Sequence, residues 1–120
     1  MRNSQVTMLS AANTASRTSA ALDVNQVVSA SFVISQSDAT AAGTFKLQAC
    51  NDLVTQRDTP TPESQLINWV DIPNASVIQT ANTKQIIVIP NMCFSFIRAV
   101  WTASATSTGT VTVNANLSAI

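Results

Sequence analysis

Apolar and polar residues alternate over short stretches along most of this chain, and this period-two pattern constrains the fold more than any other feature. In "VVSASFVISQ" (27–36) the alternation assigns one face to Val28, Ala30, Phe32 and Ile34, and mostly the other face to Ser29, Ser31 and Ser35. Successive side chains of a β-strand point to opposite sides of a sheet, so the pattern predicts strands with one buried face. No window of twelve or more residues carries an apolar stripe of helical period. The chain is therefore expected to be all-β.

Other stretches support the same interpretation. "TFKLQAC" (44–50) alternates as well, with Phe45, Leu47 and Ala49 on one face and Lys46 and Gln48 on the other. "KQIIVI" (84–89) is an almost continuous apolar run, which predicts a strand buried on both faces, and "NWVDI" (68–72) predicts a shorter strand. The Ala-rich stretch 11–21 is interrupted by Ser and Thr, so we expect extended or irregular structure there rather than a helix.

The last third of the sequence predicts a β-hairpin. "FSFIRAVWT" (94–102) and "TVTVNANL" (110–117) flank the turn-like connector "ASATSTG" (103–109). The predicted register pairs Trp101 with Val111, Ala99 with Val113 and Ile97 with Ala115, which places all six on one apolar face. The polar face then holds Arg98, Thr110, Thr112, Asn114 and Asn116. A shift of the register by one residue would expose all of these apolar side chains to water. The sequence therefore strongly favours the register that buries them.

The number and spacing of these stretches predict an antiparallel β-sandwich of seven or eight short strands, with jelly-roll-like topology. A length of 120 residues fits one domain. We expect residues 19–120 to form that domain, and residues 1–18 to be a polar N-terminal arm or a first edge strand.

Charge is scarce and balanced. Charged residues make up 10% of the chain, against about 25% in a typical protein, and six basic residues offset six acidic ones. A net charge of zero gives no attraction to phosphate backbones or anionic membranes, so neither nucleic acid nor a membrane is an expected partner. The N-terminus lacks the apolar run of a secretory signal, and the expectation is that the chain stays in the compartment where it is made.

The residue inventory argues against an enzyme. The chain has no His and no Tyr, which removes the usual general base, the triads built on His and most zinc sites. We expect no catalytic residues, no metal and no cofactor. The densest acidic group is Asp52, Asp58 and Glu63, and its spacing does not match the Ca²⁺-binding loop pattern.

That acidic group belongs to the segment "CNDLVTQRDTPTPES" (50–64), which holds four of the twelve charged residues of the chain. Pro60 and Pro62 cannot donate to a central ladder, so 53–64 is predicted to be an exposed connection at one end of the sandwich. A solvated tip is the favoured interpretation. The alternative is an interaction loop that uses Arg57, Asp58 and Glu63.

Four further residues have two interpretations each. Cys50 and Cys93 are expected to be small buried hydrophobes, and a disulfide between neighbouring strands is the alternative. Trp69 and Trp101 are expected in the core, and stacking on sugar rings is the alternative. Arg98 is expected to pair with Asp52 or Asp71, and a contact to another chain is the alternative.

The sequence also resembles a known class of proteins. "GTFKLQACND" (43–52), "NWVDIPNASV" (68–77) and "FSFIRAVWTASATSTGTVTVNAN" (94–116) are similar to motifs of small β-sandwich proteins encoded among the virion genes of tailed phages. The resemblance covers roughly residues 19–117. This chain has Cys50 where a serine is usual, and a longer charged loop after Asp52. The resemblance implies a capsid decoration, head-fibre or tail-associated subunit without enzymatic activity.

Three hypotheses follow. The first is a non-enzymatic structural protein of a phage particle, made in the host cytoplasm and located in the virion. Its expected partners are further copies of itself, as a homo-oligomer, and other virion proteins such as the major capsid protein. The second is a carbohydrate-binding sandwich that uses Trp69, Trp101 and the 51–65 loop. The third, an enzyme that uses the acidic loop, is disfavoured by the lack of His.

Overall fold

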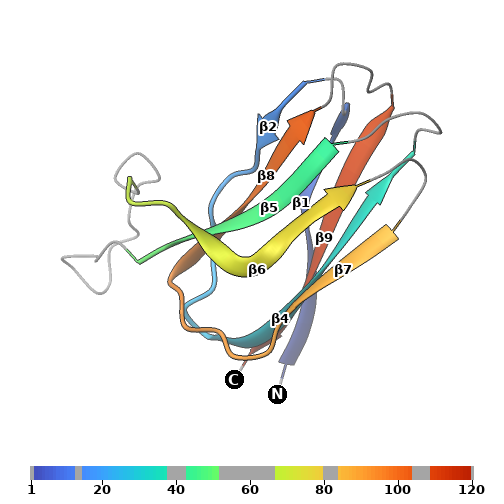
Figure 1. The fold of residues 1–120 in the computed structure, drawn as a ribbon. Helices are drawn as coiled ribbons and strands as arrows, with labels where there is room; N and C mark the ends of the chain where they lie inside the picture. The colour runs from blue at the N-terminus through green and yellow to red at the C-terminus, as the bar shows by residue number, and fades with distance from the viewer. Residues whose placement is uncertain are drawn as a thin grey trace.

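The chain is a sandwich of two antiparallel β-sheets (Figure 1). The computed structural model describes residues 2–12, 15–37, 43–51, 67–79, 84–103 and 109–119. One sheet has the order β1-β9-β4-β7, and the other has the order β2-β8-β5-β6, with β3 also paired to β8. The strands are β1 (Arg2–Ala12), β2 (Arg17–Thr18), β3 (Leu22–Asp23), β4 (Val27–Gln36), β5 (Gly43–Cys50), β6 (Val70–Gln79), β7 (Lys84–Ile89), β8 (Phe96–Ala103) and β9 (Thr110–Ala119).

The strands pair in nested order, and this order defines a jelly roll. β1 pairs with β9, β2 and β3 with β8, β4 with β7, and β5 with β6, all antiparallel. β2 and β3 act as one interrupted strand because Ser19 bridges the gap between them. Its backbone N–H donates to the Ala99 carbonyl at 2.9 Å, and its hydroxyl accepts from the Ala99 N–H at 2.8 Å. The predicted antiparallel sandwich is confirmed, and the eight strands of a jelly roll are present once β2 and β3 are taken together.

The core lies between the two sheets and is filled by the alternating inward positions of the strands. Its largest fully buried side chains are Trp101, Phe32, Phe45, Ile34, Leu47 and Ile97. The predicted inward faces of β4 and β5 are confirmed except at Val28, which is exposed. The register of β4 against β9 shifts between Val27 and Ser29, and this irregularity turns Val28 out of the alternation.

The predicted hairpin of residues 94–117 is wrong. β8 lies between β2 and β5 in one sheet, and β9 lies between β1 and β4 in the other (Figure 1). The six side chains assigned to a common apolar face are all fully buried, but they face the core from opposite sheets: Ile97, Ala99, Trp101, Val111, Val113 and Ala115. Alternation determines which side of a strand is buried, and it carries no information on which strand lies beside it.

The prediction for "KQIIVI" is also wrong. Ile87 and Ile89 of β7 are buried in the core, but Ile86 and Val88 are 64% and 62% exposed on the outer face. β7 is the last strand of its sheet, with β4 as its only ladder partner among the described strands. An apolar run therefore lies on a strand that has one covered face and one open face.

At the N-terminus, β1 is the other edge of the same sheet, and it pairs with β9 from Arg2↔Ala119 to Ala12↔Thr110. The stretch 11–21 is extended where it is described, since it contributes to β1 and β2. No helix long and apolar enough to cross a membrane occurs in the described part of the chain.

Candidate functional site

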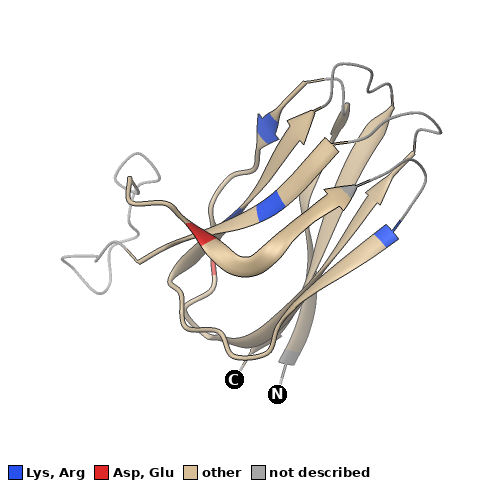
Figure 2. Cartoon of the chain, in the orientation of Figure 1, with Lys and Arg blue, Asp and Glu red and all other residues tan. Residues whose placement is uncertain are grey.

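A row of polar side chains, linked by hydrogen bonds, crosses the outer face of the sheet from β6 over β5 to β8. The Lys46 ammonium lies 3.1 Å from a carboxylate oxygen of Asp71. The Gln48 amide donates to Asp71 at 2.9 Å and accepts from Nε of Arg98 at 2.9 Å. Cross-strand register explains the contacts, because Gln48 of β5 lies opposite Asp71 of β6 on one side and Arg98 of β8 on the other. Figure 2 shows a basic position on β5 beside an acidic one on β6.

Trp69 closes one end of this network. The guanidinium carbon of Arg98 lies 4.3 Å from the centre of the Trp69 ring, which is a cation–π contact. Trp69 is half-buried and packs against a small cluster formed by Cys50 and Phe96. Its expected core role is therefore met only in part, at the edge of a small apolar cluster, whereas that of Trp101, which is fully buried, is confirmed. Arg98 is linked to Asp71 as expected, but through Gln48 rather than by direct pairing. Asp52 lies outside the described residues.

The electrostatics of the network favour a structural role over acid–base chemistry. The hydrogen bond from Gln48, followed by that from Lys46, lowers the pKa of Asp71 below its ordinary value of 3.8. A general acid or base works best when its pKa lies near the operating pH, and this shift moves Asp71 away from that range. The contacts link β5, β6 and β8 side by side, and the lowered pKa keeps the Asp71 carboxylate ionised near neutral pH.

The remaining predicted site residues fall in two groups. Arg57, Asp58 and Glu63 lie outside the described residues, as does the whole predicted connection 53–64. Cys50 is buried and Cys93 is exposed, and the two are not joined in a disulfide, so the expected burial is correct only for Cys50. No group of three or more His, Cys, Asp or Glu side chains suited to a metal ion occurs in the described ranges.

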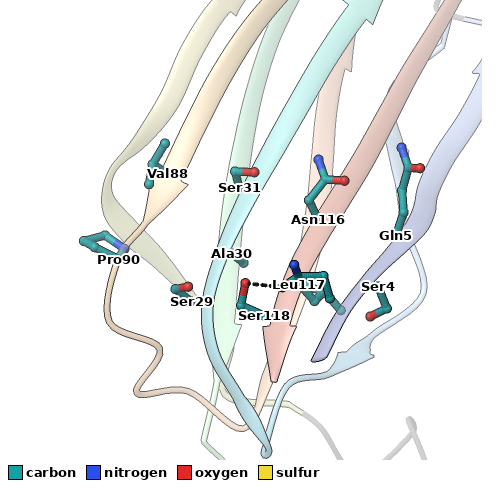
Figure 3. Close-up of a pocket in the computed structure, with 11 residues that line it drawn as sticks. Ser4, Gln5, Ser29, Ala30, Ser31, Val88, Pro90, Asn116, Leu117 and Ser118 are labelled. Atoms are coloured by element: carbon teal, nitrogen blue, oxygen red, sulfur yellow. Dashed lines mark hydrogen bonds between the residues drawn. The ribbon is translucent and has the colours of Figure 1, made fainter. Parts of the chain in front are cut away.

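A groove of about 710 Å³ lies on the outer face of the other sheet. Val88, Ser31, Asn116 and Gln5 form a row across β7, β4, β9 and β1, because each is the register partner of the next (Figure 3). A second row includes Ser29 and Ser118, and the Ser118 hydroxyl donates to Asn3 at 2.9 Å. Among the described residues, the lining is hydroxyl, amide and aliphatic, with no charged side chain.

Sequence reasoning missed the groove and the role of Gln48. The alternation in 27–36 and 110–117 correctly assigned serines and asparagines to outer faces. Their assembly into one row depends on β4 and β9 being neighbours, which no local pattern indicates. Gln48 was assigned to the face of Lys46, but its position between Asp71 and Arg98 depends on the same kind of long-range register.

The same fold occurs in two solved structures of phage-derived proteins. The crystal structure of the PBSX exported protein XepA matches with a TM-score of 0.69 over 98% of this chain, at 10% sequence identity, and this chain spans 37% of the XepA chain. The crystal structure of the SPBc2 prophage-derived protein YomS matches with a TM-score of 0.60 over 97% of this chain and 92% of that chain, at 16% identity. No protein-family model and no curated protein matches the sequence. The resemblance to small phage β-sandwich proteins is thus confirmed at the level of the fold.

Proposed function

We propose that this chain is a non-enzymatic structural protein of a phage particle, which decorates the capsid or forms part of a head or tail appendage. The observation that carries the proposal is the likeness to YomS, a prophage-derived protein, which extends over nearly the whole of both chains. A shared fold does not by itself fix a role. The role is therefore argued from the surface of this chain as well.

Two features of the described surface support assembly rather than catalysis. The outer-face network ties three strands together and keeps the pKa of its carboxylate low. The outer face of the other sheet carries neutral hydroxyls and amides beside exposed aliphatic side chains. A protein of zero net charge has little colloidal repulsion between copies, which suits a dense assembly.

Mass spectrometry of purified phage particles tests the proposal. We expect peptides of this chain in particles that have been banded by density and treated with protease-free nuclease. Particles from a host that produces the phage without this gene are the control. Absence of the chain from intact particles would overturn the proposal.

Carbohydrate binding is the second candidate, and the groove is the observation that favours it. The Trp-based site expected for this function is not supported, because Trp101 is fully buried and the ring of Trp69 carries Arg98. A neutral row of Ser31, Asn116 and Gln5 suits an uncharged glycan. Titration with neutral oligosaccharides tests it: Asn116→Ala should weaken binding, and Asn25→Ala, outside the groove lining, should not.

A further inference from the structure

The four sheet edges of this sandwich differ in how they are protected. An exposed edge offers unpaired backbone groups to another chain, and proteins usually block it with short strands, prolines, bulges or charges. β2 and β3 are two residues long each. β6 contains Pro73 and Asn74, whose φ of 62° is left-handed, and its register with β5 is broken between Lys46 and Gln48. β1 is bulged between Thr7 and Leu9.

β7 carries such devices only at its two ends, and none at its four central residues 85–88. Its six residues pair with β4 from Ala30↔Ile89 to Ser35↔Lys84 without a shift in register. Its only charged residue is Lys84, at the first position, and Pro90 follows the last (Figure 2). The outer face of β7 exposes Ile86 and Val88 by 64% and 62%. An edge without a register shift, with its one charge at the first residue and two large aliphatic side chains exposed, is the least protected of the four.

We propose that β7 pairs antiparallel with β7 of a second copy of this chain, so that two four-stranded sheets join into one continuous sheet. The pairing that centres on Ile87 places Ile86 opposite Val88 of the second copy, and Val88 opposite its Ile86. Cross-strand aliphatic pairs of this kind stabilise a sheet. The four side chains then cover one another on the outer face of the joined sheet.

Charge and symmetry identify a second copy as the occupant. In the centred register Lys84 lies opposite Pro90 of the second copy, so the two lysines are at opposite ends of the paired strands and do not repel each other. The pairing has two-fold symmetry and closes after two subunits, which avoids open-ended growth. The zero net charge of the chain adds no long-range repulsion between copies.

The first test is the mass in solution. Light scattering after size exclusion should give a particle of two chains, each of 12.7 kDa, for the wild type. Val88→Lys should shift the mass to a single chain because it places an ammonium against the aliphatic side chain of the second copy. Val70→Lys is the matched control: Val70 is 67% exposed on β6 of the other sheet, and the same substitution there should leave the dimer intact.

The second test addresses the register, in a Cys93→Ser background that removes the exposed native thiol. The Ile86→Cys/Val88→Cys double variant places the thiol at position 86 of each copy opposite the thiol at position 88 of the other copy, and should form a covalent dimer on mild oxidation. Ile86→Cys alone should crosslink far less, because its thiol then faces Val88 of the second copy.

Four outcomes would overturn the proposal. These are a wild type that stays a single chain at all concentrations measured, a dimer that survives Val88→Lys, a dimer that Val70→Lys dissociates, and a double variant that does not crosslink. Thermal melts of each variant check that the monomer remains folded. The result is independent of the proposed role in a phage particle, since it is measured on purified protein.

Discussion

At the scale of single residues, the close packing of Gly43 against Trp101 constrains the core. Gly43 begins β5 and lies under the indole of Trp101, and a Cβ at this position would overlap Cζ2 and Cη2 of that ring. It would also lie 2.8 Å from the backbone oxygen of Thr102. The absence of a side chain at Gly43 therefore makes room for the largest buried side chain of the protein.

This contact gives a coupled prediction for stability. Trp101→Ala should lower the free energy of unfolding by about 3–5 kcal/mol, the range for deletion of a large buried aromatic. Gly43→Ala should lower it by about 1–3 kcal/mol through overpacking. Because the overlap is with the six-membered ring of the indole, Gly43→Ala should cost less in a Trp101→Phe background. Urea unfolding of the wild type, of Gly43→Ala, of Trp101→Phe and of the Gly43→Ala/Trp101→Phe double variant measures the coupling. Strictly additive losses of stability would contradict the contact.

Gln36 has a buried side-chain amide that lacks hydrogen-bond partners among the described residues. Its side chain points inward at the end of β4 and is buried, and neither its amide nitrogen nor its amide oxygen has a hydrogen-bond partner among the described residues. A buried polar group without a partner costs about 1–3 kcal/mol. Gln36→Met should therefore raise the free energy of unfolding by about that amount in denaturant melts.

Gln48→Met is the matched control for that substitution. Gln48 donates to Asp71 and accepts from Arg98, so the same change should lower stability. If Gln36→Met destabilises the protein as Gln48→Met does, the Gln36 amide is satisfied in solution and its burial has no net cost.

At the scale of the strands, the sequence correctly predicted which side chains of a strand point into the core. It could not predict which strands lie next to each other in a sheet. Phe32, Ile34, Phe45, Leu47 and Trp101 all point inward as the alternation indicates. The pairing of β8 with β9 failed because their connector joins strands in opposite sheets, and a sandwich gives both arrangements the same local pattern. The exposed face of β7 was missed for the same reason, since an apolar run does not reveal whether its strand is central or at an edge.

The same limit applied to the candidate site. Arg98 and Asp71 were associated because opposite charges tend to pair, but the intervening Gln48 follows from the order β8-β5-β6 alone. The groove residues come from β1, β4, β7 and β9, which span nearly the full length of the sequence. The local alternation of apolar and polar residues does not show which of these distant segments become neighbours in the sheet.

The β5–β6 ladder carries a prediction for pH dependence. The pKa of Asp71 is lowered in the folded protein by Gln48 and Lys46, so its ionised form favours folding. That contribution is fully present above the ordinary pKa of 3.8, which the carboxyl has in the unfolded chain, and it is lost as the pH falls through the lower folded value. The difference in melting temperature between wild type and Asp71→Asn should therefore be constant at neutral pH and shrink in strong acid. A difference that grows on acidification would contradict the network.

At the scale of the whole molecule, the nested pairing makes distant parts of the chain depend on one another. β1 and β9, the first and last strands, form the longest ladder of the sheet that contains the groove. Each remaining pair is nested inside the one before it, and β5 with β6 is the innermost. The connection between β5 and β6 therefore joins the innermost pair, and no other strand pair is nested inside it.

This position gives the last prediction, which concerns residues 53–64. The two strands that flank the segment are held without it, by the register Ala49↔Val70 and by the cluster of Cys50, Phe96 and Trp69. Closure entropy changes by only about 0.6 kcal/mol for each doubling of loop length. A Gly-Ser linker in place of 53–64 should therefore leave the melting temperature of the protein nearly unchanged. If particle assembly and host attachment also persist, Arg57, Asp58 and Glu63 form no interaction site, as we expect. A chain that fails to fold with the linker would show that the segment contributes to the core and that the prediction of an exposed connection is wrong.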